Sequence, residues 1–477
     1  MLIESLLKHA AQRPRDPALL LAPDADLDGG RDVMSWAALA RLVECTAHRL
    51  AAFDGGDRRV CVAHVVENTW HDVILALSCP VAGFVEAPID CSGGVAYEDV
   101  CRQGLEACDG FSLYWIDETE KRSIIEESLR SATTAPCELG GRVALAPHDD
   151  ALILWTGGTT GESKGVVLSH ASLHSNAAAK LRAVPQSVDD LRLTLLSISH
   201  GYARTSDLGT WLLSGCRLAI GRGFQGWEDY AGTRPTLINA VPSLAERLID
   251  THTDALRLLG CGGASMATDA FEAWRDRGVT VIQGYGLTET GPVICSQTPQ
   301  SSIAERVGGF VDGWEHRIEG ERLFVRGRHL MSRYLDDPEA TADVLAADGW
   351  FDTGDLVRWD DQADQLEIVG RSGDRITLSN GHNVDPVRIE TRYAALAAIR
   401  NAVVMCSEDT RRVELWIEWE GDQRVDVSPV TESFARWERP VSVNEFKLPE
   451  TLRSRWANRK GMLRREPLIS WLRESVS

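Results

Sequence analysis

The segment ALILWTGGTTGESKGVVLSH at residues 151–170 is the feature that most constrains the fold. An apolar run stops at a cluster of Gly, Thr and Ser that carries one lysine, and a second apolar run follows. A short apolar run bounded by glycine is typical of a buried strand. Glycines let successive backbone N–H groups point into one concavity, which suits an anion such as phosphate. The segment therefore predicts a buried strand that leads into an anion-binding loop, with Lys164 as a mobile positive charge.

The loop differs from the phosphate loop of the Walker type. In that motif, G-x-x-x-x-G-K-[ST], the lysine directly follows a glycine. Here two residues separate Gly161 from Lys164, and Gly165 follows the lysine. Taken alone, the segment fits a flexible surface turn and a phosphate loop about equally well, so its interpretation depends on the rest of the chain.

Length and composition limit the class of protein. A chain of 477 residues exceeds one ordinary core and predicts at least two domains. Hydrophobic residues make up 44% and charged residues 25%, which is typical of a soluble globular protein. The formal net charge of −20 argues against general binding to nucleic acid or to anionic lipid.

The eleven cysteines contain no C-x-x-C pair, which indicates reduced thiols. Pro, Gly and Glu interrupt the apolar region 73–89, so we expect a cytoplasmic protein with no membrane span.

The pattern of helices and strands changes along the chain. Up to about residue 135, helical stretches alternate with β-rich runs such as RVCVAHVV, which favours βαβ units and a largely parallel sheet. A second α/β stretch contains the strand candidates ALILW, LRLTLLSI, CRLAI, TLINA and VTVIQGY. Residues 307–369 have the short strands and turns of a small β-rich subdomain, and after residue 374 the chain is α+β again. The predicted fold class is α/β, with a large N-terminal domain of two α/β subdomains and a small β-rich subdomain, followed by a small α+β C-terminal domain.

Three further motifs follow the glycine-rich loop in order. QGYGLTETGP at 283–292 places a tyrosine, a threonine and a glutamate within five residues, between glycines that keep the backbone accessible. GWFDTGDL at 349–356 places an aspartate at a tight turn, and VGRSGDRITLSNGHNVDPVRIE at 369–390 combines an arginine with two glycine loops. The succession T-G-G-T-T-G-E-S-K-G, Y-G-L-T-E-T, T-G-D and G-R-S-G-D closely resembles the adenylate-forming enzymes, from about residue 19 to the C-terminus.

This superfamily contains acyl- and aryl-CoA synthetases, the adenylation domains of peptide synthetases, and firefly luciferase. The resemblance implies that ATP activates a carboxylic acid to acyl-AMP with release of pyrophosphate. The acyl group then passes to a thiol, either that of CoA or that of the phosphopantetheine arm of an acyl carrier protein. Because two anions meet in the first step, the site has to cancel charge as it builds at the α-phosphate.

The resemblance assigns the phosphates to three places in the sequence. The loop from Thr156 to Lys164 contacts the β- and γ-phosphates, and Thr288 bonds the α-phosphate. Glu289 holds Mg²⁺, a hard cation suited to carboxylate and phosphate oxygens. His200 lines the site of the acid. The implied catalytic residues are therefore Lys460, Thr288, Glu289 and His200.

The nucleoside has its own set of implied contacts. The glycines of CGGASM line the adenine pocket, Tyr285 stacks on the ring, and Arg371 also contacts the nucleotide. Asp355 accepts hydrogen bonds from the ribose hydroxyls, as a carboxylate can in a bidentate way. The implied ATP-binding residues are Thr156, Gly157, Gly158, Thr159, Thr160, Gly161, Lys164, Gly262, Gly263, Ala264, Tyr285, Asp355 and Arg371.

The resemblance divides the chain into an N-terminal AMP-binding domain, residues 1–372, and a mobile C-terminal domain, residues 373–477. In the family the second domain rotates between the two half-reactions, and Gly373 occupies the hinge position. Glycine absorbs large φ/ψ changes most easily. Gly381 would line the approach of the thiol. Lys460 is the adenylation lysine, although its surroundings match the family's G-K-x-x-R pattern poorly, and Lys447 is the next candidate.

The motifs SHGYARTSDLGTWLLSG and LSNGHNVDPVRIE resemble the long-chain fatty acid–CoA ligase branch. Peptide-synthetase adenylation domains usually carry an aspartate before residue 205, and none lies between Asp190 and Asp207. A fatty or related non-amino acid is therefore favoured. Three alternatives stay open: a ligase that loads only a carrier protein, a nucleotide-binding homologue without activity, and a luciferase-like oxygenase. The absence of a G-x-S-x-G motif argues against a serine hydrolase. The oligomeric state is not predicted.

Overall fold

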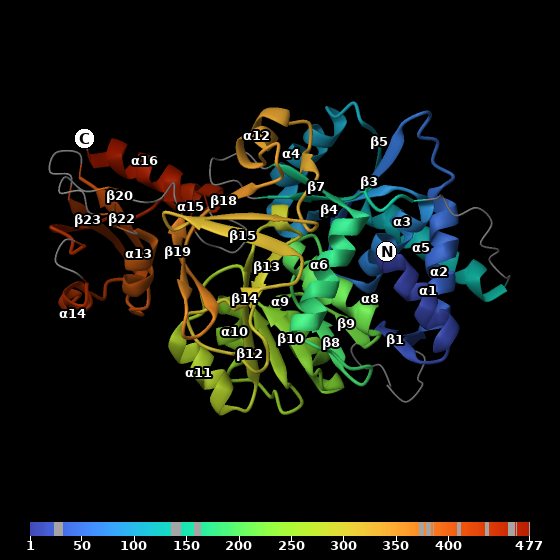
Figure 1. Ribbon diagram of the computed structural model, residues 1–477, viewed down its shortest axis with the longest axis horizontal. Helices are drawn as coiled ribbons and strands as arrows, with labels where there is room; N and C mark the ends of the chain where they lie inside the picture. The colour runs from blue at the N-terminus through green and yellow to red at the C-terminus, as the bar shows by residue number, and fades with distance from the viewer. Residues whose placement is uncertain are drawn as a thin grey trace.

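The computed structural model describes residues 1–22, 32–134, 145–156, 164–371, 376–377, 383–384, 386–407, 412–434, 438–456, 463 and 465–476. Two α/β layers form most of the molecule, and the C-terminal elements, orange to red, lie at one end (Figure 1).

The first sheet has six strands in the order β17-β7-β6-β4-β3-β5. β3 pairs in parallel with β4 and β5, and β4 with β6, as the alternating pattern predicts. β6 and β7 are antiparallel and flank the glycine-rich loop, with Trp155 opposite Gly165. The strands are β3 Arg59–Val66, β4 Val85–Asp90, β5 Phe111–Ile116, β6 Asp150–Trp155, β7 Gly165–Ser169 and β17 Arg333–Tyr334.

The second sheet has nine strands in the order β14-β13-β12-β11-β10-β8-β9-β1-β2. Its centre, from β9 to β12, is parallel, so the carboxyl ends of these strands lie at one edge. In parallel sheets of this kind ligands bind at that edge. The strands are β1 Pro17–Leu20, β2 Val33–Ser35, β8 Leu191–Thr194, β9 Arg217–Ile220, β10 Leu237–Ala240, β11 Leu258–Cys261, β12 Thr280–Gly286, β13 Val293–Ser296 and β14 Gly309–Phe310.

Helices connect and cover the strands of both sheets (Figure 1). The longer ones are α1 Leu2–Gln12, α2 Trp36–Leu50, α3 Trp70–Ala82, α4 Gly94–Glu106, α5 Glu118–Thr134, α6 His170–Ala183, α9 Gly223–Tyr230 and α11 Thr268–Asp276. The shorter ones are α7 Gly201–Ala203, α8 Thr210–Ser214, α10 Pro242–Leu248 and α12 Pro338–Val344, with one-turn segments η1 Cys91–Gly93, η3 Ala231–Thr233 and η4 Thr288–Thr290. A π-helical turn, η2 Arg204–Gly209, joins α7 to α8. Such turns are frequent at functional sites.

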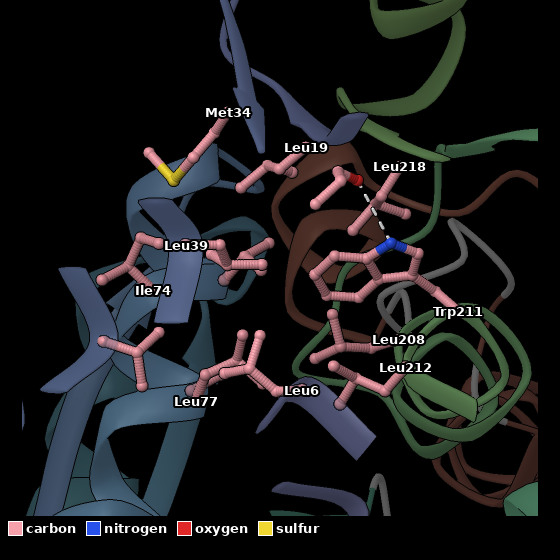
Figure 2. Close-up of a cluster of buried hydrophobic side chains, with 14 of the residues drawn as sticks. Leu6, Leu19, Met34, Leu39, Ile74, Leu77, Leu208, Trp211, Leu212 and Leu218 are labelled. Carbon is pink, nitrogen blue, oxygen red and sulfur yellow. Dashed lines mark hydrogen bonds between the residues drawn. The ribbon is translucent and has the colours of Figure 1, made fainter. Parts of the chain in front are cut away.

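A hydrophobic core joins the N-terminal helix to the second sheet. Leu6 from α1 is 1% exposed and packs in one cluster with Leu19, Leu208, Trp211 and other apolar side chains (Figure 2). The indole Nε1 of Trp211 donates a hydrogen bond to the Ala18 carbonyl oxygen at 3.2 Å. The apolar face of α1 therefore packs against η2 and α8, the helix that follows it.

A four-stranded antiparallel sheet forms the β-rich part, in the order β15-β16-β18-β19. The C-terminal part has a two-stranded and a three-stranded sheet with flanking helices. The elements are β15 Trp314–Glu319, β16 Arg322–Gly327, β18 Phe351–Asp360, β19 Gln365–Arg371, β20 Ile376–Thr377, β21 Asn383–Val384, β22 Ile399–Cys406, β23 Val413–Trp419, β24 Ser442–Glu445, α13 Pro386–Ala394, α14 Ser428–Glu432, α15 Glu450–Trp456 and α16 Arg465–Val476. Within the described ranges, no helix combines the length and apolarity needed to cross a membrane.

Candidate active site

The two ends of the glycine-rich loop are held together. The Thr156 amide donates a hydrogen bond to the Lys164 carbonyl oxygen at 2.9 Å. Lys164 Nζ lies 5.0 Å from the centre of the Tyr334 ring, a cation–π contact that directs the lysine toward β17. Residues 157–163 lie outside the described part of the chain, and with them the predicted residues Gly157, Gly158, Thr159, Thr160 and Gly161.

Tyr334 also reaches the predicted metal ligand. Its hydroxyl donates a hydrogen bond to Glu289 Oε1 at 2.7 Å. Burial raises the pKa of Tyr334, and the neighbouring Glu289 carboxylate raises it further, so the phenol remains a neutral donor. The Met331 amide holds the Glu289 carbonyl oxygen at 2.7 Å. Glu289 lies in η4, which begins at Thr288, so both predicted residues share one turn.

The described residues fit ATP with a divalent cation. No group of three His, Cys, Asp or Glu side chains in the described ranges is placed to hold a metal ion by itself. Mg²⁺ does not need such a cage, because it is usually held by one or two carboxylates together with substrate phosphates and water. Glu289 is partly exposed. Within the described ranges its side chain accepts one hydrogen bond, at Oε1, so the second carboxylate oxygen is available. One carboxylate is thus available for the cation and one lysine for the phosphates, as a complex of Mg²⁺ with ATP requires.

Tyr285, Asp355 and Arg371 form a second cluster. The Tyr285 hydroxyl donates to Asp355 Oδ2 at 2.5 Å, and Arg371 Nε lies 2.9 Å from Asp355 Oδ1. Asp355 in β18 and Arg371 in β19 are register partners, which brings two distant motifs together. Burial raises the pKa of Asp355, and the Arg371 guanidinium opposes this shift. Because a carboxylate has about four lone-pair sites, each oxygen keeps an acceptor site for a ribose hydroxyl.

The three residues Gly262, Gly263 and Ala264 follow β11 and leave a surface nearly free of side chains. Gly262 is buried, whereas Gly263 and Ala264 are exposed. Gly263 has a φ of +80°, in the left-handed region that favours glycine. A Cβ at Gly262 would lie 3.2 Å from the ring of Tyr202. A flat group such as an adenine ring could therefore approach the backbone closely at these three residues.

His200 lies where the two parallel sheets meet. Its Nε2 is 2.9 Å from Asp90 Oδ2, at the carboxyl end of β4, and Arg222 Nη2 donates to Asp90 Oδ1 at 3.0 Å. Asp90 is 3% exposed and also accepts bonds from the amide and hydroxyl of Ser92 at 2.7 Å. Although burial raises the pKa of Asp90, the bonds from His200 and Ser92 hold it well below its usual range. Sequence reasoning missed Asp90 and Arg222, because each lies in a segment without a recognisable motif.

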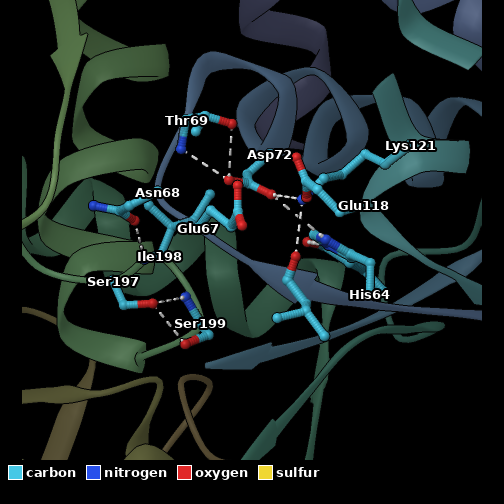
Figure 3. A network of polar contacts seen from close by, with 12 residues as sticks. His64, Glu67, Asn68, Thr69, Asp72, Glu118, Lys121, Ser197, Ile198 and Ser199 are labelled. Atoms are coloured by element: carbon cyan, nitrogen blue, oxygen red, sulfur yellow. Dashed lines mark hydrogen bonds and ion pairs between the residues drawn. The ribbon is translucent and has the colours of Figure 1, made fainter. Parts of the chain in front are cut away.

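The buried amide of Asn68 holds the segment that carries His200. Asn68 donates to the carbonyl oxygens of Leu196 at 3.0 Å and Gly221 at 2.6 Å. Its Oδ1 accepts from the Ile198 amide at 2.9 Å (Figure 3). It therefore fixes the loop between β8 and the histidine. The loop after β3 that carries Asn68 leads directly into α3.

A chain of ionic contacts runs from α5 through the first sheet to η2. Lys121 pairs with Asp72, His64 lies near Asp72, and His64 Nε2 is 3.2 Å from Glu86 Oε1 (Figure 3). Glu86 in turn pairs with Arg204, the first residue of η2. Burial lowers the pKa of His64 well below its usual value, so this histidine is neutral. Its Nε2 hydrogen-bonds Glu86, whereas its Nδ1 lies 3.8 Å from Asp72 Oδ1, beyond hydrogen-bond distance.

The remaining predicted residues belong to the C-terminal part. Gly373, Gly381 and Lys460 all lie outside the described residues, so the hinge, thiol and lysine assignments stay predictions. Lys447, the other candidate lysine, is described and exposed, just after β24.

Residues 106–335 match the model of the family described as "AMP-binding enzyme". Over these residues the chain is similar to the AMP-binding enzyme family. The match includes the glycine-rich loop, Glu289 and Tyr334, and it agrees with the family predicted from the motifs.

Curated relatives match most of the chain. Feruloyl-CoA synthase of Amycolatopsis sp is 26% identical over 425 residues, covering 80% of this chain and 82% of the relative. Indoleacetate–CoA ligase of Aromatoleum aromaticum is 27% identical over 455 residues, covering 86% of each. The anthranilate CoA ligase AuaEII in complex with anthranoyl-AMP has a TM-score of 0.81 at 17% identity, with 98% of this chain and 96% of that chain covered. The structural match confirms the predicted fold class of this chain. The predicted long-chain branch stays a prediction.

Proposed function

We propose that this protein is an acid–thiol ligase. It activates a carboxylic acid with ATP to acyl-AMP and pyrophosphate, and then transfers the acyl group to a phosphopantetheine thiol. The observation that carries the proposal is the contact of Tyr334 with both Lys164 and Glu289. This contact places a positive charge beside a carboxylate suited to Mg²⁺, next to a loop of glycines and hydroxyls. The CoA ligases among the curated relatives support the same reaction.

In the first half-reaction the substrate carboxylate attacks the α-phosphorus of ATP, and pyrophosphate leaves with the electron pair of the broken P–O bond. Lys164 and the loop from Thr156 bind the departing phosphates, and Thr288 donates to the α-phosphate. Bound Mg²⁺ supplies charge neutralisation at the phosphate oxygens. Tyr334 orients the Glu289 carboxylate that would hold the cation. These charges are in place before reaction, which is how such sites lower a barrier.

The nucleoside is bound by the second cluster together with the residues that follow β11. Asp355 accepts from the ribose hydroxyls while Tyr285 and Arg371 hold its two oxygens in position. Gly262, Gly263 and Ala264 give the adenine ring access to the backbone. His200, fixed by Asp90, lines the site of the acid.

In the second half-reaction the thiol attacks the acyl carbon and AMP leaves. We propose that residues 373–477 form a domain that turns about Gly373 between the two steps, with residues 1–372 as the fixed body. Lys460 serves adenylation and Gly381 lines the path of the thiol. CoA is the acceptor that the relatives' names favour, and an acyl carrier protein is the alternative. The ten cysteines in the described ranges form no disulfide bonds, which agrees with a cytoplasmic setting.

The first test is exchange of labelled pyrophosphate into ATP, over a panel of fatty and aryl acids. The proposal predicts exchange that requires the acid and is lost in Glu289→Gln. Mass spectrometry of thioesters formed with CoA and with a carrier protein then identifies the acceptor. A complete lack of exchange with every acid, in a protein that binds ATP, would instead support a nucleotide-binding homologue without activity.

A further inference from the structure

A cavity of about 60 Å³ lies between η2 and the first sheet. Its wall comes from α1, α3, α6, α8, β4, β6 and η2, and leucine and alanine side chains make up most of it. Three of these leucines, Leu77, Leu208 and Leu212, also belong to the core cluster drawn in Figure 2. The cavity is therefore a gap in the packing between the two halves of the N-terminal part.

The cavity is separate from the acid site at His200. Glu86 lines it from the amino-terminal half of β4, whereas Asp90, the partner of His200, ends the same strand. The four residues between them span about 13 Å of strand. Within the described ranges, none of the residues proposed for ATP or for the acid belongs to the wall.

Two polar side chains of the wall each keep a buried atom without a hydrogen bond. Arg204 is 9% exposed and His170 is 7% exposed. In the part of the chain that the structure describes, neither Nη1 of Arg204 nor Nε2 of His170 has a partner. Glu86 pairs with Arg204, but at Nη2. Because most buried polar atoms in native proteins have a partner, these two atoms indicate that the cavity has an occupant.

The two atoms favour an occupant that accepts hydrogen bonds. A guanidinium has only donors, and a histidine ring can donate from Nε2 whether it is neutral or protonated. Hydrogen bonds from a guanidinium to a carboxylate are roughly twice as strong as those between neutral groups. The apolar remainder of the wall suits a short alkyl group. A cavity of about 150 Å³ holds benzene, so this smaller cavity takes a smaller molecule.

We propose that this cavity is a second carboxylate site, which binds a small monocarboxylate such as propionate, apart from the acid of the ligase reaction. The carboxylate accepts hydrogen bonds from Arg204 Nη1 and His170 Nε2, and the alkyl group contacts the leucines. The site goes beyond the proposed ligase function and does not depend on it. Water is the rival occupant, since at about 30 Å³ for each molecule the cavity has room for about two.

The carboxylate binds together with a proton. Glu86 already balances the charge of Arg204, so a second carboxylate beside them leaves a buried negative charge, which is costly. One proton, on His170 or on the carboxyl group, cancels this charge. The ring is neutral beforehand, because burial lowers the pKa of His170 to about 4. The charged groups near the ring are Asp149, Asp150, Arg59 and the N-terminal amine.

The test is isothermal titration calorimetry of the whole protein with propionate, in the absence of ATP. The proposal predicts one saturable site that sodium chloride at the same ionic strength does not fill. Because one proton is taken up on binding, the dissociation constant should rise about tenfold from pH 6 to pH 7.

Variants locate the site. Ala76→Leu fills the cavity from α3, and His170→Phe removes one of the two donors. Each should weaken propionate binding by at least about tenfold. The matched controls, Ala273→Leu in α11 and His148→Phe at an exposed position, should bind as the wild type does. His200→Ala, which alters the proposed acid site, should also leave the dissociation constant unchanged.

Two results would overturn the proposal. A lack of saturable propionate binding would leave water as the occupant of the cavity. Binding that is lost in His200→Ala and kept in Ala76→Leu would instead assign propionate to the acid site. If Ala76→Leu does not fold, His170→Phe decides between the two sites. Neither result requires pyrophosphate exchange, so the proposed ligase function is tested independently of this site.

Discussion

The Tyr334 hydroxyl lies 2.7 Å from Glu289 Oε1, while Lys164 Nζ lies 5.0 Å from the centre of the same tyrosine ring. One side chain from a two-residue edge strand thus contacts the base of the glycine-rich loop and the proposed Mg²⁺ ligand. The register of β17 with β7 places it there, with Tyr334 opposite Val166.

Tyr334→Phe tests this contact. Loss of the hydroxyl leaves the Glu289 carboxylate without its hydrogen bond, at a cost of about 1–2 kcal/mol. We expect kcat/KM for ATP in the exchange assay to fall about tenfold and the Mg²⁺ concentration for half-maximal rate to rise. The control is Tyr230→Phe in α9, outside the site. Wild-type kinetics in Tyr334→Phe would contradict the role of the contact.

Asp90→Asn tests the partner of His200. The substitution keeps the shape of the side chain but removes the charge that His200 and Arg222 share. We expect kcat/KM for the acid in adenylation to fall about tenfold, because the histidine loses a fixed orientation. Asp276→Asn, at the exposed end of α11, is the matched control. If both variants have the wild-type kcat/KM, Asp90 does not position His200.

Glu86→Gln tests the ionic chain beneath η2. Glu86 is 1% exposed, and its removal leaves the buried Arg204 guanidinium without a counter-charge. Breaking a buried pair in this way costs about 3–5 kcal/mol, whereas Glu127→Gln, which breaks the exposed pair with Arg49, costs at most about 1 kcal/mol. Urea unfolding midpoints measure both. Equal midpoints for the two variants would show that the buried chain adds no stability.

Lys180 gives a prediction about pH. This lysine in α6 donates a hydrogen bond to Ser296 Oγ at 2.7 Å, and burial lowers its pKa to about 7. Between pH 7 and the usual lysine pKa near 10.5, the unfolded chain binds the proton that the folded chain releases, so stability rises with pH. The stability of the wild type relative to Lys180→Met should therefore increase from pH 7 to pH 9, by up to about 1.4 kcal/mol per pH unit.

The control for this prediction is Lys447→Met, because Lys447 is exposed. Urea unfolding at pH 7 and pH 9 gives the comparison for each variant. A constant difference between wild type and Lys180→Met across this range would mean that Lys180 titrates at its ordinary pKa.

The sequence predicted the fold and part of the site, for reasons that lie in local pattern. Strands β3, β6, β8, β9, β10 and β12 were predicted because buried parallel strands are continuous apolar runs. The two ends of the glycine-rich loop, and Asp355 and Arg371, lie in motifs whose residue types and order match those of the family. The sequence alone could therefore identify them.

The residues that were missed depend on tertiary contacts. Tyr334 and Asp90 each meet a partner that is 30 or more residues away in sequence, and no local spacing reveals such a pair.

The most direct test of the ligase function uses an acid labelled with ¹⁸O in its carboxylate. If the carboxylate attacks the α-phosphorus of ATP and the thiol then attacks the acyl carbon, one labelled oxygen must remain on AMP. Mass spectrometry of the AMP released during thioester formation should therefore find one ¹⁸O in each molecule. Unlabelled AMP, or label in inorganic phosphate, would contradict an acyl-adenylate intermediate.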